Sequence, residues 1–131
     1  MLRIMGMILM LAIYPANAYA KPYTPEDPTI TYASLVQVLA NQEKFHGTLV
    51  QFIAYARNEG DGVAFYLTYE DALNENSKDG VWSDKWRFDE TAAKRPVRCL
   101  IAGIYDSAHN GPGGLWSGEM QKIEKVVILG K

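Results

Sequence analysis

Residues 48–57 read TLVQFIAYAR, and this stretch decides the fold class. Its two alternating sets of side chains are both apolar: Val50, Phe52 and Ala54 in one set, and Leu49, Ile53 and Tyr55 in the other. Alternating β-branched and aromatic residues predict a strand rather than a helix. Because both sets are apolar, we expect both faces to be covered, as in the long, curved first strand of a small barrel.

A second strand follows closely and forms a hairpin with the first. Residues 58–62 (NEGDG) are rich in the types that adopt positive φ, and residues 63–68 (VAFYLT) return as a strand. Residues 48–68 therefore predict a β-hairpin. Thr68, followed by two acidic residues, resembles a capping box, so we expect one helical turn directly after the hairpin.

Three further strands are expected downstream. The first is short (residues 81–83, VWS), the second strongly apolar (97–105, VRCLIAGIY) and the third closes the chain (119–129), with Ile123, Val127 and Leu129 on one face. Between them, residues 89–94 predict a brief helix that Pro96 ends, and the glycine-rich residues 109–114 predict a loop.

A short helix is expected before the hairpin. Leu35, Val38 and Leu39 occur at helical spacing, so residues 31–40 predict a helix with Thr31 as N-cap, ending at Asn41 or Gly47. Residues 21–30 contain three prolines and predict an extended lead-in. The folded domain is therefore expected to cover residues 31–131.

The first twenty residues have the three parts of a secretory signal peptide. Arg3 precedes the uncharged residues 4–14, and the small residues of ANAYA (16–20) allow cleavage before Lys21 or before Tyr19. The apolar run is shorter than the roughly 20 residues that span a bilayer, so no membrane span is expected after cleavage. We expect a periplasmic or secreted protein.

The net charge indicates which class of ligand to expect, and the cysteine content excludes an intramolecular disulfide. Removal of Arg3 leaves 12 of the 13 basic residues against 15 acidic residues, a net charge of −3. A mildly acidic domain lacks the field that attracts double-stranded nucleic acid, so we expect a protein or glycan ligand instead. Cys99 is the only cysteine; it can form no intramolecular disulfide, and its place between Val97 and Ile101 predicts a buried thiol.

No arrangement of residues predicts catalysis, a metal or a cofactor. His46 and His109 lie more than sixty residues apart and belong to no metal-binding motif, so we expect both to be exposed loop histidines. The group most similar to a catalytic Ser-His-Asp set is Asp106, Ser107 and His109. Residues of these types are also common in turns that have no catalytic role. The glycine loop at residues 111–114 lacks the Lys-Ser/Thr that follows a phosphate-binding loop.

Three stretches carry a resemblance to a known group: residues 45–50 (FHGTLV), 65–72 (FYLTYEDA) and 97–103 (VRCLIAG). They resemble small, mostly uncharacterised exported bacterial proteins with OB-fold-like β-barrels. The resemblance implies a mainly β, five-stranded OB-like barrel, and for its class the binding of ligands or proteins rather than chemistry. Its motifs are core and turn positions and imply no site residue. A standard OB-fold places its main helix between strands three and four, whereas here the best helix precedes strand one.

The candidate binding segment is residues 81–88 (VWSDKWRF), in which cations alternate with large aromatic rings. Such rings stack on flat ligands, while Lys and Arg pair with anionic groups. The candidate ligand-binding residues are Trp82, Lys85, Trp86 and Arg87, with Tyr66 and Trp116. Period two also fits a half-buried strand or a link that caps the barrel.

The predicted function is a non-enzymatic exported binding module for a protein or glycan. One alternative is an inhibitor or immunity protein that blocks a secreted enzyme through a projecting loop, formed by residues 84–95 or 106–118. A second alternative is a small hydrolase. The sequence predicts no oligomeric state.

Overall fold

The computed structural model describes residues 29–89 and 95–130. The predicted signal peptide, residues 21–28 of the lead-in and nearly all of the predicted helix at residues 89–94 lie outside the described residues. Within the described ranges, no helix has the length and apolar character that crossing a membrane requires.

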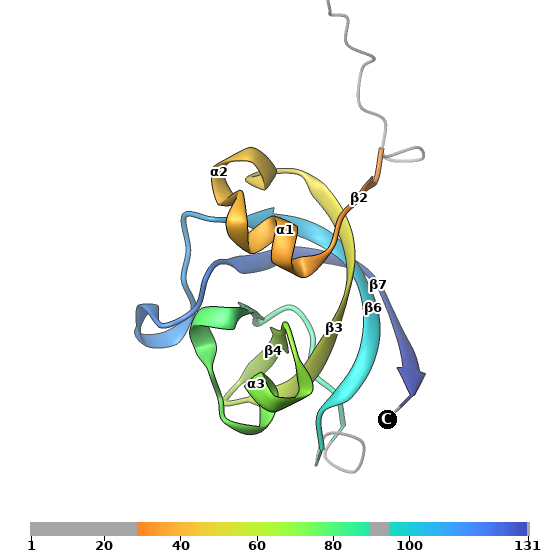
Figure 1. Cartoon of the computed structure of the whole chain (residues 1–131), viewed down its shortest axis with the longest axis vertical. Helices are drawn as coiled ribbons and strands as arrows, with labels where there is room; N and C mark the ends of the chain where they lie inside the picture. Colours follow the sequence, from red (N-terminus) through yellow and green to blue (C-terminus); the bar gives the residue numbers. More distant parts are fainter. Residues whose placement is uncertain (1–28, 90–94, 131) are drawn as a thin grey trace, which may run out of the picture.

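The protein is mainly β, and its strands form one sheet that nearly closes into a barrel (Figure 1). Its strands are β2 (Thr31–Tyr32), β3 (Leu49–Glu59), β4 (Gly62–Tyr66), β5 (Gly80–Ser83), β6 (Val97–Asp106) and β7 (Glu119–Gly130). The order β3-β4-β5-β7-β6 returns to β3 because β3 also pairs with β6. The pairing is least extensive between β5 and β7, which meet in parallel at one residue pair, Trp82 and Glu119.

The sheet has six strands, one more than predicted. The added strand is β2, which pairs in parallel with Val50 and Gln51 of β3. The predicted helix consequently begins later than Thr31, as α1 (Leu35–Ala40). Ser34 caps it, because the hydroxyl of Ser34 accepts from the backbone of Gln37 while the Gln37 side chain accepts from the backbone of Ser34.

The predicted hairpin, the helical turn after it and the three downstream strands agree with the structure apart from their ends. The hairpin is confirmed, with β3 running on to Glu59 so that only Gly60 and Asp61 form the turn. The helical turn is confirmed as α3 (Tyr69–Leu73), capped by Thr68. The other short helices are α2 (Gln42–Phe45), which follows α1, and the 3-10 turns η2 (Ser77–Asp79) and η4 (Pro112–Gly114).

The core fills the inside of the ring. Its buried members from the strands include Val50, Phe52, Phe65, Val81 and Ile101. Leu35, Val38 and Phe45 join this core from α1 and α2, which lie against the ring of strands (Figure 1). Cys99 is fully buried, as predicted, and burial raises the pKa of its thiol to about 12.

The predicted face of the last strand is wrong. Ile123 packs against the core as expected, but its partner there is Val126, while Val127 and Leu129 are exposed. The register of β6 against β7 shifts three times, and each extra residue reverses the side to which the next side chain points.

Candidate functional site

Three of the six predicted ligand-binding residues are buried. Tyr66, Trp82 and Trp116 form a cluster of their own, together with two alanines and separate from the barrel interior. The rings of Tyr66 and Trp116 meet edge to face, with centroids 5.5 Å apart. The two tryptophans are less than a tenth exposed and Tyr66 is fully buried. As the structure places them, these three rings are packed into the protein and offer no exposed ligand surface.

The glycine loop covers Trp116 rather than forming a loose connection. The indole packs so closely on Gly111 that a Cβ there would lie 2.2 Å from its Cδ1 atom. The backbone N–H of Trp116 donates to the carbonyl of Asn110, and the Asn110 amide donates to the Trp116 carbonyl, both at 2.9 Å. These contacts close the loop over the ring.

A partly buried polar network ties the Tyr66 hydroxyl to the end of β3. The hydroxyl donates to Glu59 at 2.9 Å, and Arg57 lies 3.4 Å from the same carboxylate. Arg57 also donates to the Ala72 carbonyl and pairs with Glu75 at 3.0 Å. Burial, opposed by the Tyr66 hydrogen bond and Arg57, raises the pKa of Glu59; burial and Glu59 raise the pKa of Tyr66. The network joins α3 to the hairpin.

The link after β5 is attached to the barrel through Phe88 and Arg87. Phe88 is buried in the core and exchanges two hydrogen bonds with the Asn58 side chain, at 2.7 and 3.0 Å. Arg87 donates to the carbonyls of Gly60 and Gly62, so it holds this link to the hairpin turn.

Lys85, Trp86 and Arg87 are the predicted ligand-binding residues that the structure leaves exposed. Lys85 pairs with Asp84 at 3.0 Å, and Trp86 is 39% exposed while its ring meets Phe88 edge to face. One ring and two cations that are already engaged within the protein make a small contact surface compared with the six residues predicted.

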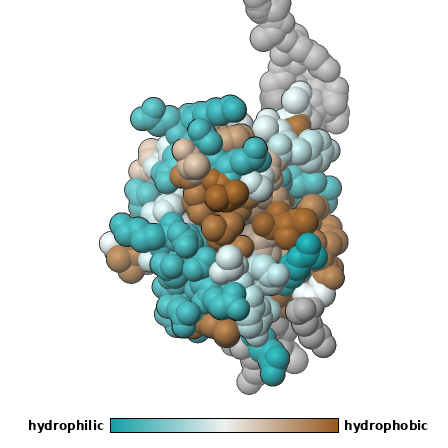
Figure 2. All heavy atoms as spheres, in the orientation of Figure 1, coloured by the Kyte–Doolittle hydropathy of each residue, from teal (hydrophilic) through white to brown (hydrophobic). Residues whose placement is uncertain are grey.

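A different exposed surface runs across three strands on the outside of the barrel. Ile53 of β3 lies opposite Leu100 of β6, which lies opposite Val127 of β7. Cross-strand partners point to the same side of a sheet, so the three side chains form one row, here called the outer patch. Ile53 and Val127 are each 42% exposed and Leu100 is half-buried. Figure 2 shows apolar surface on the side where these strands lie.

The expectation that both faces of the first strand are covered is wrong at the outer patch. Leu49 is buried and Tyr55 half-buried on the outward face, but Ile53 between them is open to solvent. The sequence carried the signal for this patch, since residues 48–57 and 97–105 are apolar in both alternating sets. Contacts with residues distant in the sequence determine which of the outward-facing side chains remain exposed.

A shallow groove continues the outer patch toward β2. Its volume is about 330 Å³, and it is lined by Tyr32, Ala33, Ser34, Gln51, Phe52, Ile53 and Leu100. Tyr32 is 72% exposed at its rim. The side-chain oxygen of Gln51 is buried there and has no hydrogen-bond partner. The groove and the outer patch thus form one continuous, largely apolar surface.

Basic side chains border the outer patch on both sides. Arg98 and Lys125 occupy the neighbouring rows on β6 and β7, opposite Gly130 and Ala102 respectively. Arg95 lines a second depression of about 430 Å³ with two tyrosines and Pro96. Among the described residues, no carboxylate pairs with any of these three cations. The surface is therefore apolar with a basic rim, in a chain whose net charge is negative.

The two histidines, distant in sequence, meet at one carboxylate. Nδ1 of His109 lies 2.7 Å from Asp106, and Nδ1 of His46 lies 3.6 Å from it. The backbone N–H of Ser107 donates to the His46 ring at 3.0 Å, and the Ser107 hydroxyl is 3.2 Å away. Both imidazoles are exposed, as predicted. In the part of the chain that the structure describes, no group of three or more acidic, His or Cys side chains is placed to hold a metal.

The ion pair between Asp106 and His109 stabilises the protein only within a limited pH range. The hydrogen bond to Asp106 raises the pKa of His109, so the stabilisation disappears as pH rises through that raised value. Partial burial favours the neutral carboxyl, but His109 and the Ala108 N–H together lower the pKa of Asp106. The stabilisation is therefore also lost when pH falls through that lowered value.

We expect Asp106→Asn to lower the pKa of His109 toward the ordinary value of histidine, because the substitution removes the charge that favours the imidazolium form. Titration of the imidazole C–H signals by NMR measures this directly in the wild type and the variant. An unchanged His109 pKa in the variant would show that the 2.7 Å contact is not formed in solution.

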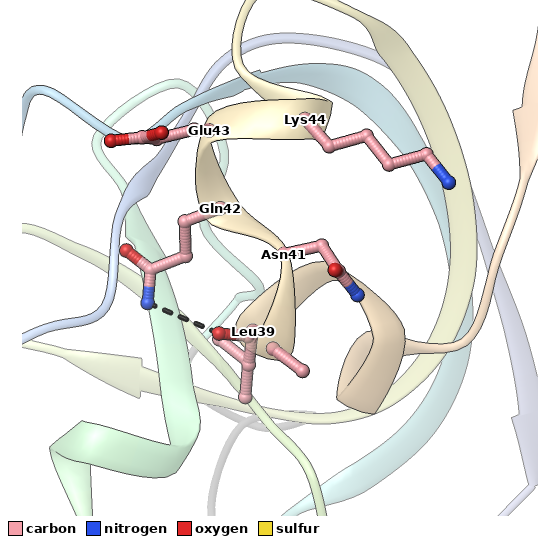
Figure 3. Close-up of a pocket in the computed structure, with 6 residues that line it drawn as sticks. Leu39, Asn41, Gln42, Glu43 and Lys44 are labelled. Carbon is pink, nitrogen blue, oxygen red and sulfur yellow. Dashed lines mark hydrogen bonds between the residues drawn. The ribbon is translucent and has the colours of Figure 1, made fainter.

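The depression at the turn between α1 and α2 offers no convergent chemistry (Figure 3). It measures about 630 Å³ but is lined only by the consecutive residues 39–44. Glu43 and Lys44 point to opposite sides, and the Gln42 amide donates to the Leu39 carbonyl at 3.3 Å (Figure 3). A binding pocket gathers groups from several elements, and this one does not.

Comparison with known proteins gives no family. No protein-family model and no curated protein matches the chain. One similar solved structure is the asparaginyl-tRNA synthetase of Entamoeba histolytica in complex with asparaginyl-adenylate, with 12% identity and a TM-score of 0.46 over 80% of this chain and 25% of the synthetase. Another is the OBody AM3L15 bound to hen egg-white lysozyme, with 16% identity and a TM-score of 0.45 over 80% of this chain and 96% of that one. Likeness at this level does not extend to function.

Proposed function

We propose that this chain is an exported, non-enzymatic binding module with an OB-like barrel, and that it recognises another protein through the outer patch and its groove. The observation that carries the proposal is the row Ile53, Leu100 and Val127, which leaves apolar side chains exposed on three adjacent strands. Contiguous exposed apolar surface with a polar rim is typical of protein-interaction sites. The strand order and the sequence resemblance support the OB-like barrel; the signal-like N-terminus supports export.

A protein partner fits this surface better than a glycan does. Sugar faces stack on flat aromatic rings, and three of the rings that suited such a role, Tyr66, Trp82 and Trp116, are buried. The exposed row consists of aliphatic side chains, which complementary apolar side chains of another protein can cover. Of the two ligand classes that the sequence predicts, protein and glycan, the proposal therefore favours protein.

A second candidate is an inhibitor or immunity protein that inserts a loop into a secreted enzyme. Leu115 is 57% exposed beside η4, and the contacts around Trp116 hold this loop in one conformation. A rigid loop with one exposed apolar anchor is suited to filling a pocket. The hydrolase alternative has weaker support, since the contact between Ser107 and His46 lies at the exposed surface.

The test is site-specific photo-crosslinking in the cells that naturally make the protein. We expect a photoreactive phenylalanine analogue at Ile53 or Val127 to give a discrete adduct with another protein in the extracytoplasmic fraction, because partner atoms would lie within a few ångströms of both positions. The matched control is Leu73, which is 52% exposed on α3. Denaturing electrophoresis and mass spectrometry identify the adducts.

Each outcome decides between the candidates. Adducts from the two outer-patch positions but not from Leu73 support the proposal. If the same photoreactive residue is also placed at Leu115, an adduct from that position alone favours the inhibitor. Absence of adducts from Ile53 and Val127, equal adducts from Leu73, or adducts formed only in the cytosol would contradict the proposed function.

A further inference from the structure

The last strand of the barrel has an edge without a partner strand. β7 pairs with β6 along its length, but on the opposite edge its pairing with β5 is limited to Glu119. Beyond Met120, no described strand pairs with that edge. Figure 1 shows the end of β7 as the outermost strand at the lower right, beside β6. An edge of this kind presents backbone N–H and C=O groups that another strand can pair with.

The free edge is most regular beside the outer patch. Register shifts interrupt the pairing of β6 and β7 before Lys122, before Lys125 and after Ile128, and such bulges protect an edge from further pairing. Between the last two shifts, Lys125 to Ile128 pair without interruption with Ala102 to Cys99. Val127 and Ile128 in this run are 42% and 53% exposed, so the regular part of the edge is also apolar.

The charges beside this edge define which strand would fit. Lys125 lies two residues before Val127 and points to the same side of the sheet. On the other side of Val127, Arg98 of β6 lies opposite Gly130, which has no side chain to stand between the guanidinium and the free edge. Lys125 on β7 and Arg98 on the neighbouring β6 therefore lie on either side of Val127, and neither cation has a carboxylate partner among the described residues.

We propose that an extended segment of the partner protein adds to the free edge of β7 as a further strand, and that its outward side chains follow the pattern carboxylate, any residue, aliphatic, any residue, carboxylate. This inference rests on the proposed function and names the partner's chemistry at the same surface. Backbone hydrogen bonds supply the pairing, the aliphatic side chain extends the row of Ile53, Leu100 and Val127, and the carboxylates face Lys125 and Arg98.

The test uses a defined peptide and the ¹⁵N-labelled protein. A capped peptide of sequence TETVTET is titrated against the protein, and we expect amide NMR shifts and slowed hydrogen exchange concentrated in residues 122–130. The peptide TKTVTKT is expected to bind about ten-fold more weakly, since two exposed charge pairs become repulsive. A TETVTET peptide with N-methylated backbone amides on its pairing edge is expected not to bind.

A charge swap separates this mode from general attraction. In the double variant Arg98→Glu with Lys125→Glu, the preference is expected to reverse in favour of TKTVTKT. The matched control, Lys78→Glu, changes an exposed lysine on η2 and is expected to leave the preference for TETVTET unchanged.

The possible failures are distinguishable. Shifts outside β7, the same preference in the charge-swapped protein, or shifts in β7 that appear on concentrating the protein without peptide would overturn strand addition by an acidic partner; the last result would assign the edge to a second copy of the chain. If crosslinks form at Ile53 and Val127 while TETVTET fails at β7, strand addition is wrong and the proposed function stands. Peptide binding at β7 without any crosslink in cells would overturn the proposed function.

Discussion

Replacing Trp116 with alanine is expected to lower the free energy of unfolding by about 3–5 kcal/mol, the range for removing a large buried aromatic side chain. The ring is 9% exposed, meets Tyr66 edge to face and lies against Gly111. Its removal leaves a cavity under the glycine loop and withdraws packing from the second cluster. Urea unfolding followed by far-ultraviolet circular dichroism measures the change without relying on tryptophan fluorescence.

Trp86→Ala is the matched control. It removes the same side chain from a position that is 39% exposed and contacts Phe88 at one edge, so we expect a loss of less than about 1 kcal/mol. Equal losses from the two variants would contradict the placement of Trp116 in a buried cluster and return it to the surface. A loss from Trp86→Ala larger than that from Trp116→Ala would reverse the assignment of the two rings.

The strands of this fold could be predicted because each is specified by a pattern of neighbouring residues. Alternating apolar residues at 48–57 and 97–105, the glycines of the hairpin turn and the cap at Thr68 each act over a few residues. The helix start was misplaced for a local reason as well, since Ser34 and Gln37 make the reciprocal capping pair that Thr31 cannot make.

The candidate site could not be predicted in the same way. Trp82 and Trp86 lie four residues apart in a segment of alternating character, and the sequence allows either ring to face solvent. Trp82 is buried and Trp86 is exposed because of long-range contacts. Trp82 lies beside Gly62 in the hairpin and joins a cluster that includes Trp116, thirty-four residues later. Closure of the sheet, rather than the segment itself, therefore decides which aromatic ring remains exposed.

The register of β6 against β7, which places Val127 in the outer patch, could not be predicted from the local sequence either. A strand pattern predicts which residues share a face only while the pairing is regular, and β7 contains three shifts against β6. These shifts bring Val127 to the outward side and Val126 to the core. The shift between Ala102 and Gly103 lies where the two backbones approach closely, which gives the second large stability effect.

Gly103→Ala is expected to destabilise the protein by about 3 kcal/mol or more, although it adds a single methyl group. A Cβ at Gly103 would lie 2.2 Å from the carbonyl oxygen of Lys122 and 3.2 Å from the Met120 side chain. A backbone oxygen in a paired strand cannot move as a flexible side chain does, so β7 must shift and its hydrogen bonds with β6 must lengthen. Urea unfolding measures the loss, and faster amide exchange along β7 locates it.

Gly114→Ala provides the control that separates close approach from backbone strain. Gly114 has φ +69° and nothing within 4 Å of an added Cβ, so alanine there is strained but not crowded, and we expect a cost of about 1–2 kcal/mol. The ordering of the two variants is the decisive observation, because composition and local propensity treat both glycines alike. If Gly103→Ala were the milder change, β6 and β7 would not approach at that residue, and the register that places Val127 in the outer patch would be wrong.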